Sequence, residues 1–130
     1  MCGINGILGL SDTTLAKQKV QAMNTAMKHR GPDDDGLFAE GEIVLGHRRL
    51  SIIDLSSAGH QPMQSHDGRF KIVYNGELYN YKELRFELKR VVSGSGEQAY
   101  FFQTNTDTEV IIAAYARWGE ACVNHFNGMF

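Results

Sequence analysis

The sequence has few prolines and cysteines, little excess charge and no long apolar run. Its 130 residues include 2 prolines and 2 cysteines, and the net charge is −2 at neutral pH. A charge this small gives no reason to expect nucleic acid or an anionic membrane surface as a partner. No segment approaches the roughly 18–20 apolar residues of a membrane span, and the N-terminus lacks the pattern of a signal peptide. We therefore expect a cytoplasmic protein.

Metal and cofactor motifs are also missing. In a reducing compartment, Cys2 and Cys122 are expected to be free thiols. The histidines are scattered without metal-ligand spacing, and the acidic run at residues 33–35 lacks the spacing of a calcium loop and is expected to be a polar turn. The glycine-rich turn expected at residues 91–98 does not end in Gly-Lys-Ser/Thr, so it is not a phosphate loop. We expect no metal and no cofactor.

The composition is that of an ordinary globular domain, with 42% hydrophobic and 22% charged residues. A chain of this length forms one domain at most and can bury a sizeable core. Residues 126–130 open an apolar stretch with no polar tail after it. We therefore expect residues 1–130 to be one domain that is incomplete at its C-terminus.

The first half of the sequence predicts strands and one long helix. Small and apolar residues alternate over residues 3–10 as in a buried strand, and apolar residues recur at helical spacing from Ala16 to Met27 after the capping residues 11–14. Residues 37–46 have a hairpin pattern, and its second strand leads into His47-Arg48-Arg49. Residues 56–67 are expected to form a loop.

The second half predicts two more strands and two helices. Residues 70–74 alternate as a half-buried strand, and a helix follows that is capped by Asn80 with Glu83 as its reciprocal partner. Residues 100–103 are expected to form a further strand. A second capping box, Thr106 to Glu109, opens a helix whose buried stripe is predicted to run from Ile111 through residues 115 and 118 to Cys122. Because the hairpin implies antiparallel pairing, the fold class is α+β or layered α/β.

The strongest chemical signal lies in the first ten residues, MCGINGILGL. Once Met1 is removed, Cys2 carries a thiol and a free α-amine on the same residue. An α-amine is partly unprotonated near neutral pH, so this residue would hold a nucleophile beside its own base. The nearby glycines keep the backbone bare, as the approach of a ligand requires. The alternative is a small residue in an ordinary strand.

Other polar residues complete a site for acyl transfer from an amide. The candidates are Cys2 as nucleophile and base, Asn75 and Gly76 as oxyanion donors, Arg49 as partner of a carboxylate, and Glu77 and Asp107 as partners of an ammonium group. A substrate with an amide, a carboxylate and an ammonium group describes glutamine or asparagine. The alternatives are surface ion pairing for Arg49, a simple turn at Asn75-Gly76, and interaction with a helix dipole for Asp107.

Several segments together carry a family resemblance. MCGINGILG, HRGPD, HRRLSIIDL, NGELYNYKELR, TDTEVI and NGMF occur in this order over the whole chain. They resemble the glutaminase domain of glutamine-dependent asparagine synthetases, which are class II glutamine amidotransferases of the N-terminal-nucleophile hydrolases. This resemblance implies a four-layer αββα sandwich with antiparallel sheets. It also implies that a second, synthetase domain is absent here, and that ATP and Mg²⁺ are used only by that domain.

The resemblance further implies a role for each candidate. Cys2 would attack the side-chain amide of glutamine, release ammonia and form a γ-glutamyl thioester, with Asn75 and Gly76 as the oxyanion hole. Arg49 would bind the α-carboxylate, Glu77 and Asp107 would bind the α-ammonium, and the backbone of the next segment would lie near the ligand. That segment is Leu50, Ser51, Ile52 and Ile53. Arg30 and Asp33 are expected to structure their loop.

Two other functions stay open at this point. One is a class II amidotransferase with a different ammonia acceptor, such as a surface-polysaccharide or amino-sugar precursor. The other is an inactive glutamine-binding module, which would follow if Met1 were retained and the amine therefore acylated. An unpaired sheet edge would also allow association, so a homodimer is a further expectation.

Overall fold

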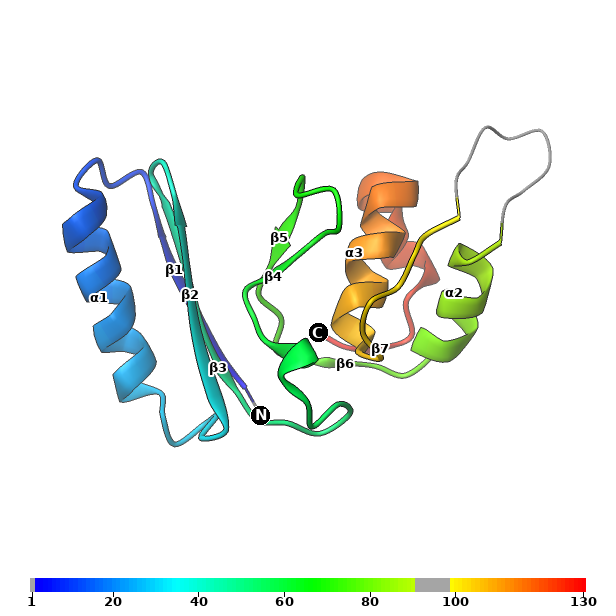
Figure 1. Cartoon of the computed structure of the whole chain (residues 1–130), viewed down its shortest axis with the longest axis horizontal. Coiled ribbons are helices and arrows are strands. Elements are labelled where there is room, and N and C mark those ends of the chain that lie inside the picture. Colours follow the sequence, from blue (N-terminus) through cyan, green and yellow to red (C-terminus); the bar gives the residue numbers. More distant parts are fainter. Residues whose placement is uncertain (1, 91–98) are drawn as a thin grey trace.

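The computed structural model describes residues 2–90 and 99–130, and it is an α+β fold with antiparallel sheets (Figure 1). The expected turn at residues 91–98 lies outside the described residues. The strands and helices are β1 Gly3–Leu8, α1 Thr13–Ala26, β2 Asp34–Glu40, β3 Ile43–Arg49, β4 Met63–Gln64, β5 Lys71–Ile72, β6 Glu77–Leu78, α2 Tyr81–Leu88, α3 Asp107–Trp118 and β7 Gly128–Met129, with 3₁₀ helices η1 Ser57–Gly59 and η2 Gly119–His125.

The largest sheet has the strand order β1-β3-β2, and both pairs are antiparallel. The predicted hairpin is confirmed as β2 and β3. Its two-residue connection begins with Gly41, whose φ of 55° favours glycine. β2 already begins at Asp34, so the expectation that the acidic run at residues 33–35 forms a polar turn is wrong. Pairing of Asp34 with Arg49 across the hairpin draws these residues into the sheet.

Helix α1 covers one face of this sheet (Figure 1). The side chain of Asp12 caps the helix by accepting a hydrogen bond from the N–H of Leu15, as predicted for this segment. Ala16 and Val20 pack against Val44 of β3 and form one apolar cluster. The opposite face of β1 is not buried as predicted, because Ile4 and Leu8 point away from α1 and are 46% and 79% exposed.

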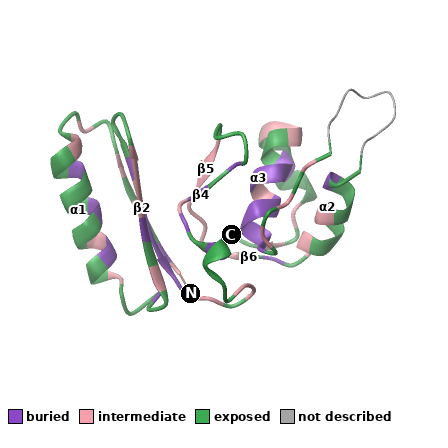
Figure 2. Ribbon diagram, viewed as in Figure 1, coloured by how far each residue is buried: buried purple, intermediate pink, exposed green. Residues whose placement is uncertain are grey.

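The second apolar cluster lies between α2, α3 and η2, and Figure 2 shows buried residues along α3. Leu84 and Leu88 of α2 contribute as predicted. The buried face of α3 is Val110, Ala113 and Ala114, whereas Tyr115 is exposed, so the predicted stripe is wrong in its phase. Helix α3 ends at Trp118 with Gly119 as its C-cap, and Cys122 is buried as predicted but belongs to η2.

Several shorter elements differ from the sequence-based expectation. Residues 100–103 form no strand, because the N–H of Gln103 is bonded to the Glu109 carboxylate and that of Tyr100 to the Leu88 carbonyl. Asn80 does not cap α2 with its side chain, which instead bonds the backbone of residues 125 and 127. The strand expected over residues 70–74 is limited to β5, and the loop at residues 56–67 contains η1 and β4.

The β4–β5 and β6–β7 pairs lie on the side of the large sheet away from α1, and α2 and α3 lie farther out (Figure 1). Thr106 caps α3 by accepting a hydrogen bond from the N–H of Glu109, which confirms that part of the capping box. Among the described residues, no helix is long and apolar enough to cross a membrane.

Candidate active site

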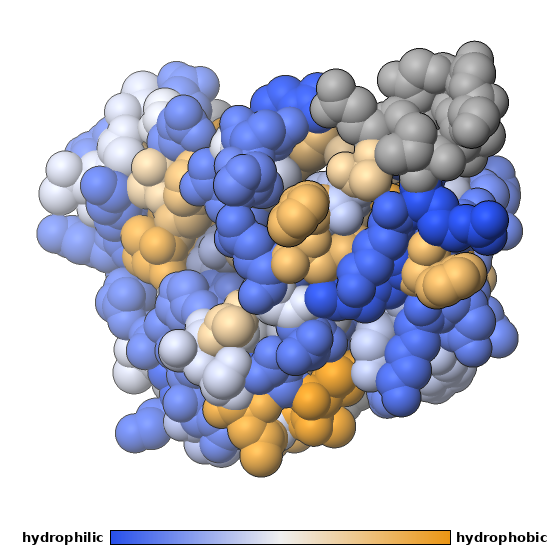
Figure 3. All heavy atoms as spheres, turned by 45° about the vertical axis from the view of Figure 1, so that its right-hand side comes forward, coloured by the Kyte–Doolittle hydropathy of each residue, from blue (hydrophilic) through white to orange (hydrophobic). Residues whose placement is uncertain are grey.

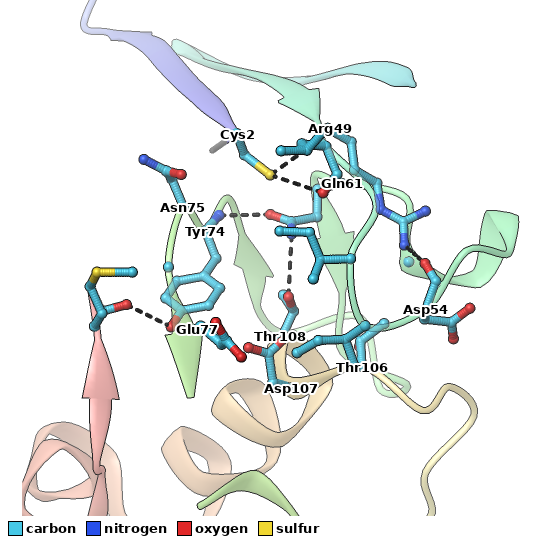
Figure 4. A pocket seen from close by; sticks show the side chains of 16 residues that line it. Cys2, Arg49, Asp54, Gln61, Tyr74, Asn75, Glu77, Thr106, Asp107 and Thr108 are labelled. Carbon is cyan, nitrogen blue, oxygen red and sulfur yellow. Dashed lines mark hydrogen bonds between the residues drawn. The ribbon is translucent and has the colours of Figure 1, made fainter. Parts of the chain in front are cut away.

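A pocket lies where the end of β3, the segment between β5 and β6, and the start of α3 meet (Figure 4). It collects residues from widely separated parts of the chain. The lining residues are Cys2, Arg49, Leu50, Ile52, Ile53, Asp54, Gly59, Gln61, Tyr74, Asn75, Gly76, Glu77, Thr106, Asp107, Thr108 and Met129. Every sequence-based candidate except Ser51 is therefore part of this one pocket.

Cys2 is placed in the pocket by the pairing of β1 with β3. Gly3 pairs with Arg48, so the preceding cysteine lies beside residues 49 and 50. The Leu50 N–H lies 3.3 Å from the Cys2 Sγ, and the thiol donates to the Leu50 carbonyl at 3.7 Å. The guanidinium of Arg30 donates to the Cys2 carbonyl oxygen at 3.1 Å. The thiol and its backbone are thus both held by neighbouring segments.

Arg49 ends β3 and is buried. Its Nη1 donates to the Ser56 carbonyl at 2.7 Å, and its Nη2 donates to the Asp54 carbonyl. Gly59 packs against the guanidinium so closely that any side chain there would collide with it. The arginine therefore holds the following loop in place. Its other N–H groups are not used by these two carbonyls and are available to a ligand in the pocket.

The segment after Arg49 divides between the pocket and the surface. Leu50, Ile52 and Ile53 line the pocket. Ser51 does not line it. Its N–H donates to the Asp33 carboxylate at 2.8 Å, and Ser51 lines a neighbouring hollow on the surface instead. This hydrogen bond agrees with the loop-structuring role expected for Asp33.

Asn75 and Gly76 lie between β5 and β6, where the chain has left one strand pair and not yet entered the next. Figure 4 places the Asn75 side chain on the same side of the pocket as Cys2. A side chain at Gly76 would collide with the carbonyl of Met129 on β7. Glycine is therefore required here by close packing of two backbones.

The two acidic candidates meet at the opposite end of the pocket from Cys2 (Figure 4). Asp107 is the first residue of α3 and is buried, and its Oδ2 accepts a hydrogen bond from the Leu78 N–H at 3.0 Å. Glu77 begins β6 and is exposed. Two carboxylates at this end would attract a cation or an ammonium group.

Sequence reasoning missed several polar residues that support the pocket, mainly the buried His47, Gln61 and Thr108 and the half-buried Tyr74. Burial lowers the pKa of His47 to about 4, although its hydrogen bond to the Tyr74 carbonyl acts in the opposite direction. Burial, aided by the charges of Asp107 and Glu77, raises the pKa of the Tyr74 hydroxyl. Both groups are therefore neutral near pH 7. The sequence carries no signal for these supporting residues, because Gln61 and Thr108 lie among other polar residues and His47 is followed by two arginines.

Comparison with known proteins gives a family for this arrangement. Residues 1–130 match the model of the glutamine amidotransferase domain. The chain belongs to this family. Its sequence is 40% and 39% identical to two glutamine-hydrolysing asparagine synthetases of Bacillus subtilis, and 39% identical to that of Zea mays.

These matches cover the whole of this chain but only 20% to 21% of each relative. The glutamine amidotransferase domain thus spans about a fifth of the relatives it resembles. Among its described residues, there is no group of three or more His, Cys, Asp and Glu side chains that could hold a metal ion.

Proposed function

We propose that this domain hydrolyses glutamine to glutamate and ammonia with Cys2 as the nucleophile. The observation that carries the proposal is the single pocket in which the Cys2 thiol lies near Asn75 and Gly76, with Arg49 and a pair of carboxylates around the remaining space. Each polar feature of glutamine has a complementary group there. Family membership and similarity to glutamine-hydrolysing asparagine synthetases support the same reaction.

The reaction proceeds in two acyl-transfer steps. After removal of Met1, the α-amine of Cys2 takes the thiol proton, and Sγ attacks the side-chain amide carbon of glutamine. The developing oxyanion accepts hydrogen bonds from the Asn75 side-chain amide and the Gly76 N–H. The carbon–nitrogen bond breaks, the amine returns a proton to the leaving group, and ammonia departs. Water then attacks the thioester with the amine as base, which yields glutamate and the free thiol.

The other end of glutamine would be held by charge. Arg49 would bind the α-carboxylate through N–H groups not used for the Asp54 and Ser56 carbonyls. Glu77 and Asp107 would bind the α-ammonium. The Leu50, Ile52 and Ile53 backbone would lie along the substrate. These steps use no cofactor.

The wider context is also part of the proposal. The described sheets and helices would form part of a four-layer αββα sandwich, and the domain would supply ammonia to a fused synthetase domain in the cytoplasm. There, ATP and Mg²⁺ would activate a carboxylate acceptor for amide formation. Because the relatives are named asparagine synthetases, asparagine is the product that we expect.

The test is covalent labelling of Cys2 by a glutamine-analogue electrophile, 6-diazo-5-oxo-norleucine, followed by intact mass. We expect a chain without Met1 that gains one adduct, together with hydrolysis of glutamine. Cys2→Ala should abolish both. Cys122→Ala is the matched control, because this second cysteine is buried in the other half of the molecule, and it should retain both. A retained Met1, or a processed chain without a Cys2 adduct, would contradict glutaminase activity and favour a binding module.

A further inference from the structure

The backbone of Tyr74 is held on both sides by buried side chains from other segments. Its N–H donates to the Gln61 Oε1 at 2.6 Å, and its carbonyl oxygen accepts from the His47 Nε2 at 3.2 Å. Residues 73–76 belong to no strand. The side chains of Gln61 and His47 therefore supply the hydrogen bonds that a neighbouring strand would otherwise give to the Tyr74 N–H and carbonyl. Tyr74 directly precedes Asn75 and Gly76, so its conformation sets where these residues lie.

Gln61 is a buried link between three parts of the pocket (Figure 4). Besides accepting from Tyr74, its amide nitrogen donates to the Thr108 Oγ1 at 3.3 Å. Thr108 follows Asp107 in the first turn of α3. One amide group thus fixes the segment before Asn75 relative to the helix that carries Asp107.

His47 completes the arrangement from the central strand of the large sheet. It is fully buried, and its Nε2 must carry the proton because a carbonyl oxygen only accepts. The low pKa caused by burial keeps the ring neutral at pH 7. A neutral ring protonated on Nε2 is a single, fixed donor. His47 also belongs to the strand that ends at Arg49, beside Cys2.

We propose that Gln61 and His47 are positioning residues that fix the two peptide groups flanking the Tyr74 Cα and thereby aim Asn75 and Gly76 at the intermediate formed on Cys2. This inference rests on the proposed glutaminase function. Oxyanion donors act only when they are already in place as charge develops, and a misplacement of about 1 Å costs on the order of a hundredfold in rate. Neither residue touches the reacting atoms in this role.

A purely structural role is the competing interpretation. Both side chains also satisfy partly buried backbone groups of Tyr74, so their loss would lower stability in either case. A structural role predicts loss of folded protein with normal kcat and KM in the fraction that remains. A positioning role predicts a lower kcat in fully folded protein, with KM nearly unchanged, because ground-state contacts to glutamine are retained.

The experiment compares the kinetics of wild-type and substituted proteins. Each is purified as the full-length protein with Met1 removed, and its folding is confirmed by circular dichroism. Gln61→Met keeps the length of the side chain but removes the acceptor, and we expect kcat to fall about 10–100-fold with KM within about threefold. Gln61→Glu restores an oxygen acceptor and should recover part of kcat. Gln64→Met makes the same change at an exposed position on β4 and should match wild type.

The same logic applies to His47. His47→Leu removes the donor, whereas His47→Gln restores an N–H at nearly the same reach, so His47→Gln should keep the higher kcat.

Amide hydrogen exchange of Tyr74 tests the hydrogen bond itself without any substrate. The Tyr74 N–H should exchange slowly in wild type and Gln64→Met, and at least tenfold faster in Gln61→Met.

The outcomes separate this inference from the proposed function. Equal exchange of the Tyr74 N–H in wild type and Gln61→Met would show that Gln61 does not hold this backbone group and would overturn the inference, whatever the activity. Faster exchange with an unchanged kcat would overturn its positioning role. If wild-type protein with a free Cys2 failed to hydrolyse glutamine, the proposed function would fall and the catalytic consequence with it, while the exchange result would still decide whether Gln61 holds the backbone.

Discussion

At the scale of single residues, the candidate active site depends on short contacts between side chains and backbone. Arg30 bonds the carbonyl of Cys2, Arg49 bonds two loop carbonyls, and Asp107 accepts from the N–H of Leu78. Such hydrogen bonds fix the positions of the functional groups and leave the interior of the pocket open for a substrate. Ion pairs of the usual surface kind contribute little by comparison.

Asn75 gives the sharpest prediction at this scale. If its amide stabilises the oxyanion, Asn75→Ala should lower kcat for glutamine hydrolysis by about 10²–10³-fold, the usual effect of losing one such donor. KM should change by less than about threefold, because the donor acts mainly in the transition state. Steady-state measurement of glutamate production checks this.

The matched control is Asn124→Ala, which removes an exposed asparagine from η2 at a distance from the pocket. We expect it to leave kcat and KM unchanged. A large rise in KM for Asn75→Ala with normal kcat would assign the residue to substrate binding and contradict its role as an oxyanion donor.

His47 predicts a specific dependence of stability on pH. Its pKa is lowered from 6.5 to about 4, chiefly by burial; the charge of Asp34 raises it slightly, and those of His60 and Arg49 lower it further. Between these pH values, the unfolded state binds the proton and the folded state does not. The free energy of unfolding therefore falls as pH is lowered from 6.5 towards 4.

We expect this single group to remove about 2 kcal/mol of stability between pH 7 and pH 5. Urea unfolding at both pH values should show that loss in wild type beyond the change seen in His47→Gln, which has no ring to protonate. An identical pH dependence in the two proteins would mean that His47 binds its proton as readily in the folded state as in the unfolded state, which would contradict the lowered pKa.

The sequence could predict most of the residues that line the pocket, whereas it could not predict the buried residues that hold the neighbouring backbone. Asn75, Glu77 and Arg49 are polar residues at places where a strand pattern stops. Gln61 and His47 bond backbone groups of Tyr74 at sequence separations of 13 and 27 residues. Local patterns carry no information about such partners, since every residue has the same backbone groups.

At the scale of elements, the contact between α1 and β3 depends on a missing side chain at Gly46. A Cβ there would lie 2.6 Å from the Asn5 Oδ1, and 2.7 Å from both the Asn24 Oδ1 and the Val20 Cγ1. The bare backbone lets the helix approach the sheet. Buried Asn24 then reaches the carbonyl of Gly36 on β2 at 3.0 Å and ties the helix to the hairpin.

Gly46→Ala should therefore lower the free energy of unfolding by about 1–3 kcal/mol, the usual cost of overpacking. Val20→Ala removes one of the colliding groups, so the double variant should lose at least about 0.5 kcal/mol less than the sum of the single losses. Urea denaturation of the four proteins measures this coupling. Strict additivity would show that the helix shifts freely at this contact.

Elements with strong local signals were predictable, and those decided by tertiary contacts were not. The hairpin and the helix capped by Asp12 have their signals in neighbouring residues. Residues 100–103 have the aromatic content of a strand, but the Glu109 carboxylate takes the N–H groups of Gln103 and Thr104. Asn80 lies at a position that is typical of a helix cap, but its side-chain amide is hydrogen-bonded to the backbone of residues 125 and 127, just before β7.

At the scale of the whole molecule, the two apolar clusters leave one sheet face incompletely covered. Leu8 pairs with Ile43 across β1 and β3, so both side chains project from the face opposite α1, as does Ile4. They are 79%, 43% and 46% exposed, respectively. Figure 3 shows several separate patches of apolar side chains on the face that it views. Exposed apolar side chains on the face of an edge strand favour association.

Expressed as these 130 residues alone, the chain should therefore self-associate through this face. Sedimentation velocity from about 1 to 100 μM should show a size that grows with concentration, because the apolar side chains of two copies would cover each other. Leu8→Thr with Ile43→Thr keeps two good strand formers while removing apolar surface, and this variant should stay monomeric over a wider range. Leu15→Gln changes an exposed leucine on α1 and should associate like the parent. A chain that is monomeric at every concentration would show that β1 and β3 tolerate this exposure, and association that persists in the threonine variant would place the contact elsewhere.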